Sequence, residues 1–450
     1  MKKETLIEKL KASYVRLIAV GFALLILLGT CLLSLPIATK TGQRMGVIDA
    51  LFTATSATCV TGLIVADTYT NWTLFGQIVI ISLIQIGGLG FITIGVYIAI
   101  LLKKKIGLWE REAVHESVST MNSAGSVKMT KKIIQGTFLL EGIAAVLLSF
   151  KFVPILGWAE GIYYGIFHAI SGFCNAGFDL MGRWEPYSSL CLFQGDVLVN
   201  VVIMLLITIG GLGFIVWDDL LRNKWHWKKY MLHTKMVLTI TAVLIFGSAF
   251  LFFLLERKNV FYGLSVKDTI LCSLFAAVTP RTAGFNTVDL AAMTDGSKLL
   301  SSILMFIGGS PGSTAGGAKT TTVVVMLLSA IAMIRSSHGV NVFGRRLEPE
   351  TVHKASTVCF INLSLALTAI LVILAIQPLE FMDVCMEVFS AIGTVGMSTG
   401  VTRELNNISK IIIILLMYCG RLGSLSFVLV FAQKKKVPPI LNPQEKMLVG

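Results

Sequence analysis

Four glycine-containing motifs recur along this 450-residue sequence at nearly equal intervals. Each motif begins with Phe-x-Ala and ends, several residues later, in a glycine followed by an apolar residue. The glycines lie 115, 107 and 112 residues apart, at Gly62, Gly177, Gly284 and Gly396. A match at both places in all four copies indicates one structural unit that is present four times.

The residues before each glycine could bind a cation through their backbone carbonyl oxygens. Such oxygens replace the hydration shell of an ion in a narrow pore, and glycine reaches positive φ without a Cβ clash. A short helix before each stretch would add the partial negative charge of its C-terminus. Arg281 is the one charged residue in these stretches, so a ring of carboxylates is not indicated. The candidate filter residues are Thr58, Cys59, Val60, Thr61, Gly62, Cys174, Asn175, Ala176, Gly177, Thr282, Ala283, Gly284, Thr394, Val395 and Gly396.

A second interpretation of the four glycines is that they only allow helices to pack closely. This interpretation leaves the Phe-x-Ala companions unexplained. A pore-forming unit accounts for both features, because it needs a short helix and an extended stretch that ends in glycine.

The elements that would position these stretches are apolar helices. The chain is 55% hydrophobic and 14% charged, with a mean hydropathy of +0.79, which excludes a single soluble domain. Eight runs are long enough to span a membrane, at 17–39, 74–102, 133–156, 197–217, 236–255, 299–334, 355–377 and 411–431. Shorter semi-polar segments near 47–63, 160–178, 267–285 and 382–397 are expected to enter the membrane and return. We therefore predict an all-α polytopic membrane protein with eight transmembrane helices and four re-entrant pore helices around one pore.

The basic residues predict the orientation of the chain. With a cytoplasmic N-terminus, 25 of the 38 Lys and Arg residues fall on the cytoplasmic side. This bias predicts a multi-pass membrane protein with both termini in the cytoplasm. It also explains the net charge of +13 without nucleic acid as a partner. All four units run in the same direction, which argues against a transporter built from inverted repeats.

Four repeats are expected from these spacings, at residues 1–110, 111–222, 223–345 and 346–450. The run at 17–39 is too long for a secretory signal and is interpreted as the first span. None of the eight cysteines forms a Cys-x-x-Cys pair, so we expect neither disulfides nor a metal site.

The third repeat is interrupted by a polar, glycine-rich stretch at 308–320 within its second span. Irregular backbone at membrane depth is stable only beside water or within protein, which predicts an intramembrane gate below the filter. Charged side chains inside a membrane are usually functional. The alternative to a gate is a broken helix with a static bend. The alternative for Arg421 is that it only donates hydrogen bonds to loop carbonyls, without a role in gating. The candidate gate residues are Gly308, Gly309, Gly312, Gly316, Gly317, Lys319 and Arg421.

The filter stretches resemble those of the Trk/Ktr/HKT superfamily of potassium transporters. They read Thr58-Cys-Val-Thr-Gly62-Leu, Cys174-Asn-Ala-Gly177-Phe, Arg281-Thr-Ala-Gly284-Phe and Gly393-Thr-Val-Gly396-Met. The identical Ile-Gly-Gly-Leu-Gly-Phe-Ile motifs at 86–92 and 209–215, with Thr-Pro-Arg-Thr-Ala-Gly-Phe at 279–285, are most similar to the bacterial Ktr membrane subunit. The resemblance extends over nearly the whole chain.

This resemblance implies potassium uptake through a filter of backbone carbonyls. In the superfamily a serine at the first filter glycine tends to admit sodium, so Gly62 implies selectivity for K⁺. The resemblance also implies activation by Na⁺, a homodimer with one pore per protomer, and a cytoplasmic ring of nucleotide-binding regulator-of-conductance subunits. Nothing in this sequence resembles that subunit, so no nucleotide is expected on this chain.

A nucleotide-binding function finds little support in the glycine motifs. A Walker A motif needs a glycine before its lysine, but Ala318 precedes Lys319 and Ser313 stands at the first glycine position. The Gly-Gly-Leu-Gly motifs do not fit Gly-x-Gly-x-x-Gly, because Thr93 and Val216 occupy the last position.

An enzyme is the other class considered, and we do not expect one. Its candidate residues would be His168, Asp179 and Glu185, which form no recognised catalytic pattern. The potassium-binding subunit of a P-type pump shares the fourfold plan, but it is longer and carries additional helices.

Overall fold

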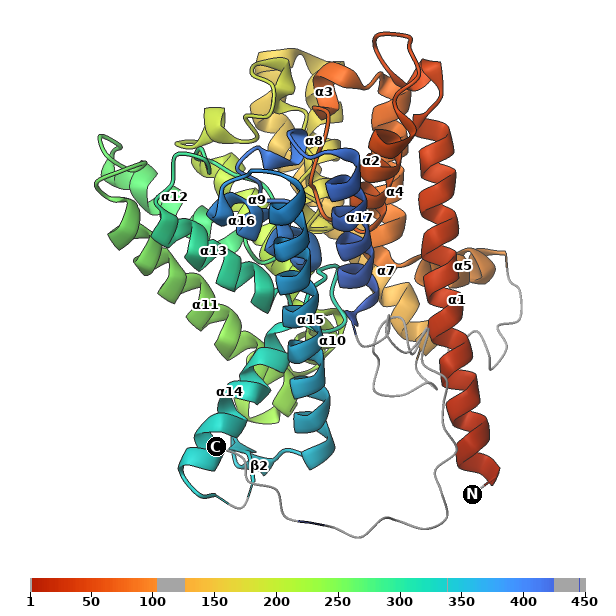
Figure 1. Cartoon of the computed structure of the whole chain (residues 1–450), viewed down its shortest axis with the longest axis vertical. Coiled ribbons are helices and arrows are strands. Elements are labelled where there is room, and N and C mark those ends of the chain that lie inside the picture. The colour runs from red at the N-terminus through yellow and green to blue at the C-terminus, as the bar shows by residue number, and fades with distance from the viewer. Residues whose placement is uncertain (1, 103–125, 338, 425–444, 446–450) are drawn as a thin grey trace.

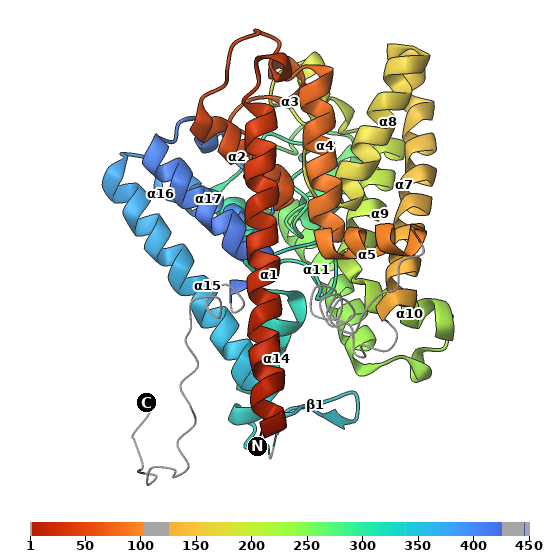
Figure 2. The ribbon, with the colours of Figure 1, turned by 90° about the vertical axis from the view of Figure 1, so that its right-hand side faces the viewer.

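The computed structural model describes residues 2–102, 126–337, 339–424 and 445. The described chain is almost entirely helical, and one hairpin pairs strand β1 (Asn341–Val342) with strand β2 (Arg345–Arg346). In Figures 1 and 2, the start of α1 and the lower ends of α14 and α15 lie at the same end of the molecule. The basic runs at 103–105 and 434–436 lie outside the described residues.

Four helices are long and apolar enough to cross a membrane by themselves. They are α1 (Lys2–Leu33), α7 (Ser126–Leu156), α11 (Leu232–Glu256) and α15 (Pro349–Ile376). Only 28–33% of the residues in each apolar window are buried within the protein, and large apolar side chains such as Phe150, Phe246 and Leu371 are exposed. Surfaces of this kind need lipid around them.

Two bent pairs of helices are further candidate spans. Helix α4 (Leu74–Leu89) meets α5 (Phe91–Leu101) at 88°, and α9 (Val197–Leu212) meets α10 (Phe214–Asn223) at 95°. The sequence predicted one continuous helix over each of these runs, and that prediction is wrong. Gly90 and Gly213 stand at the bends with φ of 84° and 98°, a conformation that ends a helix and that glycine adopts without steric cost.

Short helices occupy the four ranges expected to re-enter the membrane. They are α2 (Val47–Thr58), α8 (Trp158–Phe173), α12 (Val266–Val278) and α16 (Phe381–Gly393). The Phe-x-Ala residues lie in them: the alanines are at most 1% exposed, as are the first three phenylalanines. A small residue on a buried helix face lets the neighbouring backbone approach closely. We call these four elements the short helices.

The apolar run at 299–334 is interrupted where the sequence indicated. Helix α13 (Asp295–Ile307) ends at residue 307, and α14 (Thr320–Ile334) begins at residue 320. Helix α17 (Asn407–Leu422) ends at Gly423, whose φ is 86°, so the run predicted at 411–431 is not one continuous helix. The remaining elements are α3 (Thr68–Asn71) and the 3-10 turns Pro36–Ala38, Met181–Arg183, Cys191–Phe193, Trp227–Lys229 and Val401–Arg403.

Two largely buried ion pairs join the short helices to their neighbours. The Nζ of Lys298 in α13 lies 3.0 Å from a carboxylate oxygen of Asp383 in α16. The Nζ of Lys410 in α17 lies 2.7 Å from a carboxylate oxygen of Asp49 in α2. The second pair connects the last quarter of the chain to the first.

Replacing Lys298 by Met should destabilise the protein by about 2 kcal/mol, since it leaves Asp383 partly buried without its cation. The measurement is the midpoint of thermal unfolding of the purified protein in detergent. Lys354 is the matched control, because its side chain and that of its partner Glu350 are 64% and 73% exposed. Removing an exposed pair changes stability by less than about 1 kcal/mol. Equal shifts of the midpoint in K298M and K354M would contradict the prediction.

Candidate functional site

The four motif glycines meet in a closed ring. A Cβ built on Gly62 would lie 2.4 Å from the carbonyl oxygen of Ala176, and one on Gly177 would lie 2.7 Å from that of Ala283. A Cβ built on Gly284 would lie 2.5 Å from the carbonyl oxygen of Val395, and one on Gly396 would lie 2.2 Å from that of Thr61. Each glycine therefore touches the carbonyl before the next glycine, and the last unit closes on the first. We call Gly62, Gly177, Gly284 and Gly396 the glycine ring.

The backbone before each ring glycine alternates in handedness. Val60, Asn175, Thr282 and Thr394 have φ between 51° and 71°, and each lies two residues before its glycine, which also has positive φ. The residue between them does not. Such alternation turns successive carbonyl groups toward one side of the chain, whereas an extended strand points them to both sides. The four stretches can thus present rows of oxygens to a common centre, as a filter for a dehydrated cation requires.

Hydroxyl groups of the short helices hold this backbone in place. The amide groups of Gly62 and Gly396 donate to the hydroxyls of Ser56 and Ser390 at 3.1 and 3.0 Å. In the other two units, Ser171 and Thr279 donate to the carbonyl after the ring glycine. These four residues were not among the candidate filter residues. Their signal is a hydroxyl six residues before the glycine, or five in the third unit.

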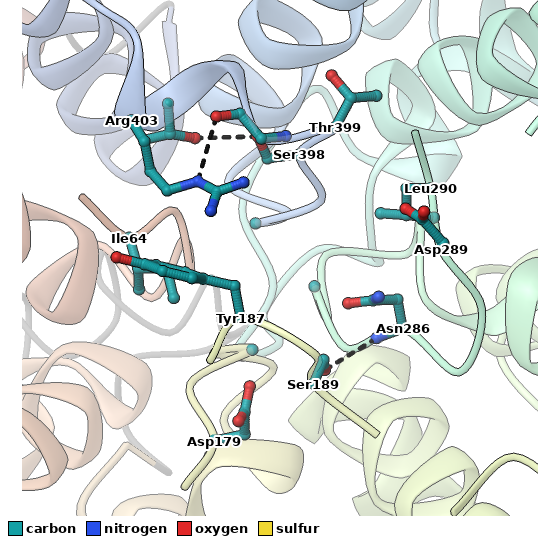
Figure 3. Close-up of a pocket in the computed structure, with 16 residues that line it drawn as sticks. Ile64, Asp179, Tyr187, Ser189, Asn286, Asp289, Leu290, Ser398, Thr399 and Arg403 are labelled. Carbon is teal, nitrogen blue, oxygen red and sulfur yellow. Dashed lines mark hydrogen bonds between the residues drawn. The ribbon is translucent and has the colours of Figure 1, made fainter. Parts of the chain in front are cut away.

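A polar pocket of about 140 Å³ opens above the glycine ring, and all four ring glycines line it (Figure 3). Figure 3 shows Arg403 over the ring of Tyr187, with 4.3 Å between the guanidinium carbon and the ring centre. On the other side of the pocket, the backbone amide of Asn286 donates to the hydroxyl of Ser189 at 3.2 Å. Carboxylates of Asp179 and Asp289 also face this space, so its acidic groups could attract cations.

The interrupting stretch, residues 308–320, lies against the opposite end of the filter stretches; we call it the central loop. A Cβ on Gly316 would lie 2.0 Å from the hydroxyl of Thr394. The hydroxyl of Thr314 donates to the carbonyl of Phe173 at 3.3 Å, at the end of the second short helix. The amide of Ser310 donates to the carbonyl of Gly211 at 3.1 Å. The central loop therefore contacts the second and fourth units from within the third.

Arg421 joins the central loop to the first unit. Its guanidinium donates to the carbonyl of Thr314 in the loop, and to the carbonyls of Gly87 and Gly88 in α4, the latter at 2.9 Å. The residue lies in the last turn of α17, where the helix dipole favours a cation. The sequence placed Arg421 beside the loop, and the structure brings the two into contact.

Lys319 ends the central loop with φ of 78°. Its Nζ donates back to the carbonyl of Ala315 at 2.7 Å, within the same loop. The loop thus carries its own positive charge close to the point where Arg421 binds it, as expected from the sequence positions.

The Ile-Gly-Gly motifs at 86–88 and 209–211, and Gly420 in α17, have a packing role that the sequence did not reveal. Cβ atoms on Gly87, Gly210 and Gly420 would lie 1.9, 2.1 and 2.2 Å from the carbonyls of Thr58, Phe173 and Ile392. These carbonyls belong to the last residues of three short helices or lie one residue before their ends. Glycine is needed here because the second helix of the first, second and fourth units presses against the end of its short helix.

The residues considered for an enzyme are not brought together as a catalytic group. His168 is fully buried in α8, and its two ring nitrogens lie 2.8 and 3.4 Å from the backbone groups of Tyr164 and Leu180. Glu185 is exposed, whereas Asp179 lines the pocket above the ring. His168 therefore has a packing role. The eight cysteines are free.

Comparison with known proteins agrees with this arrangement. The family model of TrkH, described as a cation transport protein, matches residues 20–438. The chain belongs to this family of cation transport proteins. It is 41% identical to the potassium/sodium uptake protein NtpJ of Enterococcus hirae over 98% of both chains. It is equally identical to the Ktr system potassium uptake protein B of Bacillus subtilis over the full length of both.

A solved structure shares the fold of this cation transport family member. The crystal structure of the potassium transporter TrkH from Vibrio parahaemolyticus matches with a TM-score of 0.69, covering 92% of this chain and 84% of the other at 21% identity. Family membership together with the apolar helices makes the chain a multi-pass membrane protein.

Proposed function

We propose that this protein conducts K⁺ into the cell, as the membrane subunit of a Ktr-type uptake system. The observation that carries the proposal is the closed glycine ring with alternating backbone handedness in all four units. Its relatives NtpJ and Ktr protein B are named for the uptake of potassium/sodium and of potassium. In this proposal the K⁺ ligands are backbone oxygens of the filter stretches around Gly62, Gly177, Gly284 and Gly396.

The proposed architecture is four repeats, at 1–110, 111–222, 223–345 and 346–450, with eight membrane crossings around one pore. The long helices and the bent pairs would provide these crossings, and the short helices would re-enter from outside. The excess of Lys and Arg on one side supports cytoplasmic termini in a bacterial cell membrane. The pocket above the ring would then face outward.

The proposal includes a gate and partner subunits that regulate it. The central loop, with Lys319 and Arg421, would block the path below the filter until it moves. A separate ring of nucleotide-binding subunits on the cytoplasmic side would move the loop. Two relatives are named as proteins B and D of a Ktr system, which implies that such a system has further subunits. We further propose a homodimer with one pore per protomer and activation by Na⁺, with no nucleotide on this chain.

Uptake of Rb⁺ by a strain that lacks its own potassium uptake tests the proposal. Cells that express this chain with a Ktr cytoplasmic subunit should take up Rb⁺ and grow at low K⁺, more rapidly when Na⁺ is present. Cells with the empty vector provide the baseline. Uptake at the baseline, from protein shown to be in the membrane, would contradict the proposed function.

Uptake should also depend on external pH through Asp179. Burial raises the pKa of this carboxyl to about 7. The nearby Asp67 also raises the pKa, whereas hydrogen bonds from Met181 and Ser189 lower it. The raised pKa means that Asp179 is neutral below about pH 7 and negative above it. Loss of this charge beside the filter should raise the apparent KM for Rb⁺ about twofold to threefold between pH 8 and pH 6.

Two variants separate this effect from other influences of pH. Asp179→Asn should show the higher KM at both pH values, because it cannot ionise. Asp289→Asn, which changes an exposed acid in the same pocket, should keep the dependence on pH. A wild-type pH profile in D179N would show that another group is responsible.

A further inference from the structure

The function proposed above gives no role to three side chains that are hydrogen-bonded in series behind the second filter stretch. This hydrogen-bonded chain begins at Glu141 in the middle of α7, whose side chain is 4% exposed. Both carboxylate oxygens accept hydrogen bonds from the Nε2 of Gln85 in α4, at 3.1 and 3.2 Å. The Oε1 of Gln85 in turn accepts from the Sγ of Cys174, at 3.7 Å.

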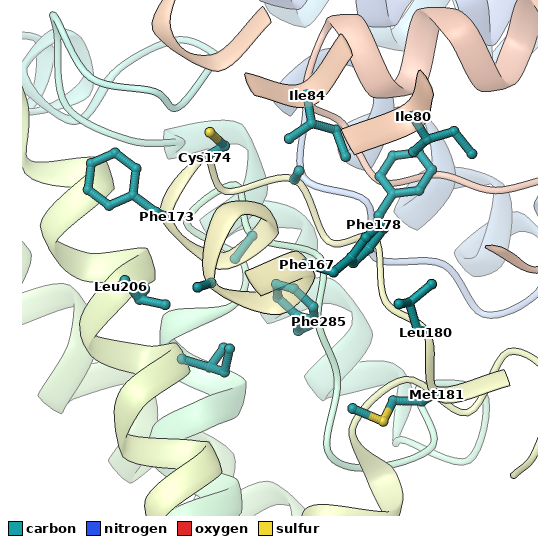
Figure 4. Packing of buried hydrophobic residues seen from close by; sticks show 14 of the residues in the cluster. Ile80, Ile84, Phe167, Phe173, Cys174, Phe178, Leu180, Met181, Leu206 and Phe285 are labelled. Carbon is teal, nitrogen blue, oxygen red and sulfur yellow. The ribbon is translucent and has the colours of Figure 1, made fainter. Parts of the chain in front are cut away.

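Cys174 connects this chain to the filter. It follows the last residue of the second short helix and stands three residues before Gly177 of the ring. A Cβ on Gly88 would lie 2.8 Å from its Sγ, so the side chain is confined between Gln85 and the glycine motif of α4. Figure 4 shows Cys174 close to the part of α4 that carries Ile84.

The same turn of α4 also binds Arg421. The carbonyls of Gly87 and Gly88 accept hydrogen bonds from its guanidinium, as described above, and Gln85 lies two and three residues before them. Side-chain contacts of this turn thus reach the second filter stretch, while its backbone reaches the central loop. Glu141 fixes the turn from behind, through the amide of Gln85.

Glu141 is an unusual residue for this position. Among the described ion pairs, none includes Glu141. Its hydrogen bonds to Gln85 are the polar contacts that offset the cost of burial. An acid inside the membrane is expensive and usually marks function, and a leucine would pack there without that cost.

We propose that Glu141 is a positioning residue for ion selectivity, acting through Gln85 on the turn at Cys174. This inference rests on the proposed function, since it treats residues 174–177 as part of a K⁺ filter. The geometry of a filter must be held closely for one ion to be preferred over another. Glu141 supplies an acceptor that keeps the amide of Gln85 oriented, so that its oxygen remains directed at Cys174.

Two substitutions of Glu141 should differ in their effect on the ion preference. Glu141→Leu removes the acceptor and should lower the preference for Rb⁺ over Na⁺ about threefold or more. Glu141→Gln retains an oxygen that accepts from Gln85, so its preference should stay near that of the wild type. Gln85→Leu and Cys174→Ala break the chain at its other members and should resemble E141L.

Uptake of Rb⁺ and Na⁺ is measured in the uptake-deficient strain with the full chain and its cytoplasmic partner. Membrane abundance and thermal midpoint are determined for each variant. Glu380→Leu, which removes an exposed acid at the start of α16, is the matched control and should not change the preference. Because the contacts form one chain, E141L/Q85L should be no worse than either single variant.

Each result decides the inference. A lowered preference in E141L, Q85L and C174A, with recovery in E141Q, supports it. An unchanged preference in these three at normal abundance overturns it, since a purely structural role would move only abundance or the thermal midpoint. An E141Q as poor as E141L overturns the hydrogen-bond route. Gly177→Ser distinguishes failure of this inference from failure of the proposed function. An unchanged ion preference in G177S would reject the filter itself.

Discussion

Replacing Arg421 by Ala should raise the rate of Rb⁺ uptake about tenfold. The guanidinium binds the carbonyls of Thr314 in the central loop and of Gly87 and Gly88 in α4. The substitution removes both this link and a positive charge below the filter. At an effective dielectric constant of about 20, two unit charges about 7 Å apart repel by about 2 kcal/mol. A barrier lower by about 1.4 kcal/mol already accelerates passage tenfold.

The initial rate of Rb⁺ uptake, corrected for membrane abundance, measures this effect. Arg222→Ala is the control, because it removes an arginine that is 70% exposed and far along the chain from the loop. Deleting residues 312–317 should also raise the rate, since this removes the part of the loop that contacts Thr394 and Arg421. Unchanged uptake in both R421A and the deletion would mean that the loop is a static bend.

Replacing ring glycines by serine should weaken the preference for K⁺ over Na⁺, most of all at Gly62 and Gly396. Cβ atoms there would lie 2.4 and 2.2 Å from carbonyl oxygens of the neighbouring unit. The ring must therefore widen or rotate, and its oxygens leave the positions that replace the hydration shell of K⁺. We expect a change in preference of about tenfold, comparable to a loss of about 1.4 kcal/mol between the two ions.

Growth at low K⁺ with rising Na⁺, together with uptake of both ions, measures the preference. Gly263→Ser is a matched control: its φ is 82°, like that of the ring glycines, but nothing lies within 4 Å of a Cβ there. It would bear the same backbone strain without touching the ring. If none of the four ring variants differs from G263S, the ring is not the filter.

The periodic spacing of the glycines and the Phe-x-Ala motifs was enough to place the four short helices. Repetition supplied what local propensity could not, because each copy confirmed the boundaries of the others. The interruption at 308–320 was equally visible, since glycine and serine cannot continue an apolar helix. The sequence also predicted that Arg421 lies beside the loop, because both stand halfway along their apolar runs.

Other features depend on contacts between units and could not be predicted locally. Continuous apolar composition across Gly90 and Gly213 suggested straight helices, although both residues end a helix with positive φ. The left-handed conformation of Val60 and Thr394 contradicts the preference of branched residues, so only the surrounding structure can impose it. A single acid such as Glu141 carries no motif, and its partner Gln85 is 56 residues away.

The closure of the glycine ring has a consequence for the biosynthesis of the protein. The last side of the ring, between Gly396 and Thr61, joins residues that the ribosome adds 335 positions apart. The bond between Lys410 and Asp49 and that from Tyr418 to the carbonyl of Ala19 connect the same two ends, at separations of 361 and 399 residues. Chains emerge and insert from the N-terminus first. A nascent chain that lacks the fourth unit therefore has only two of the four sides of the ring, and the proposed ion path cannot form until the final quarter arrives.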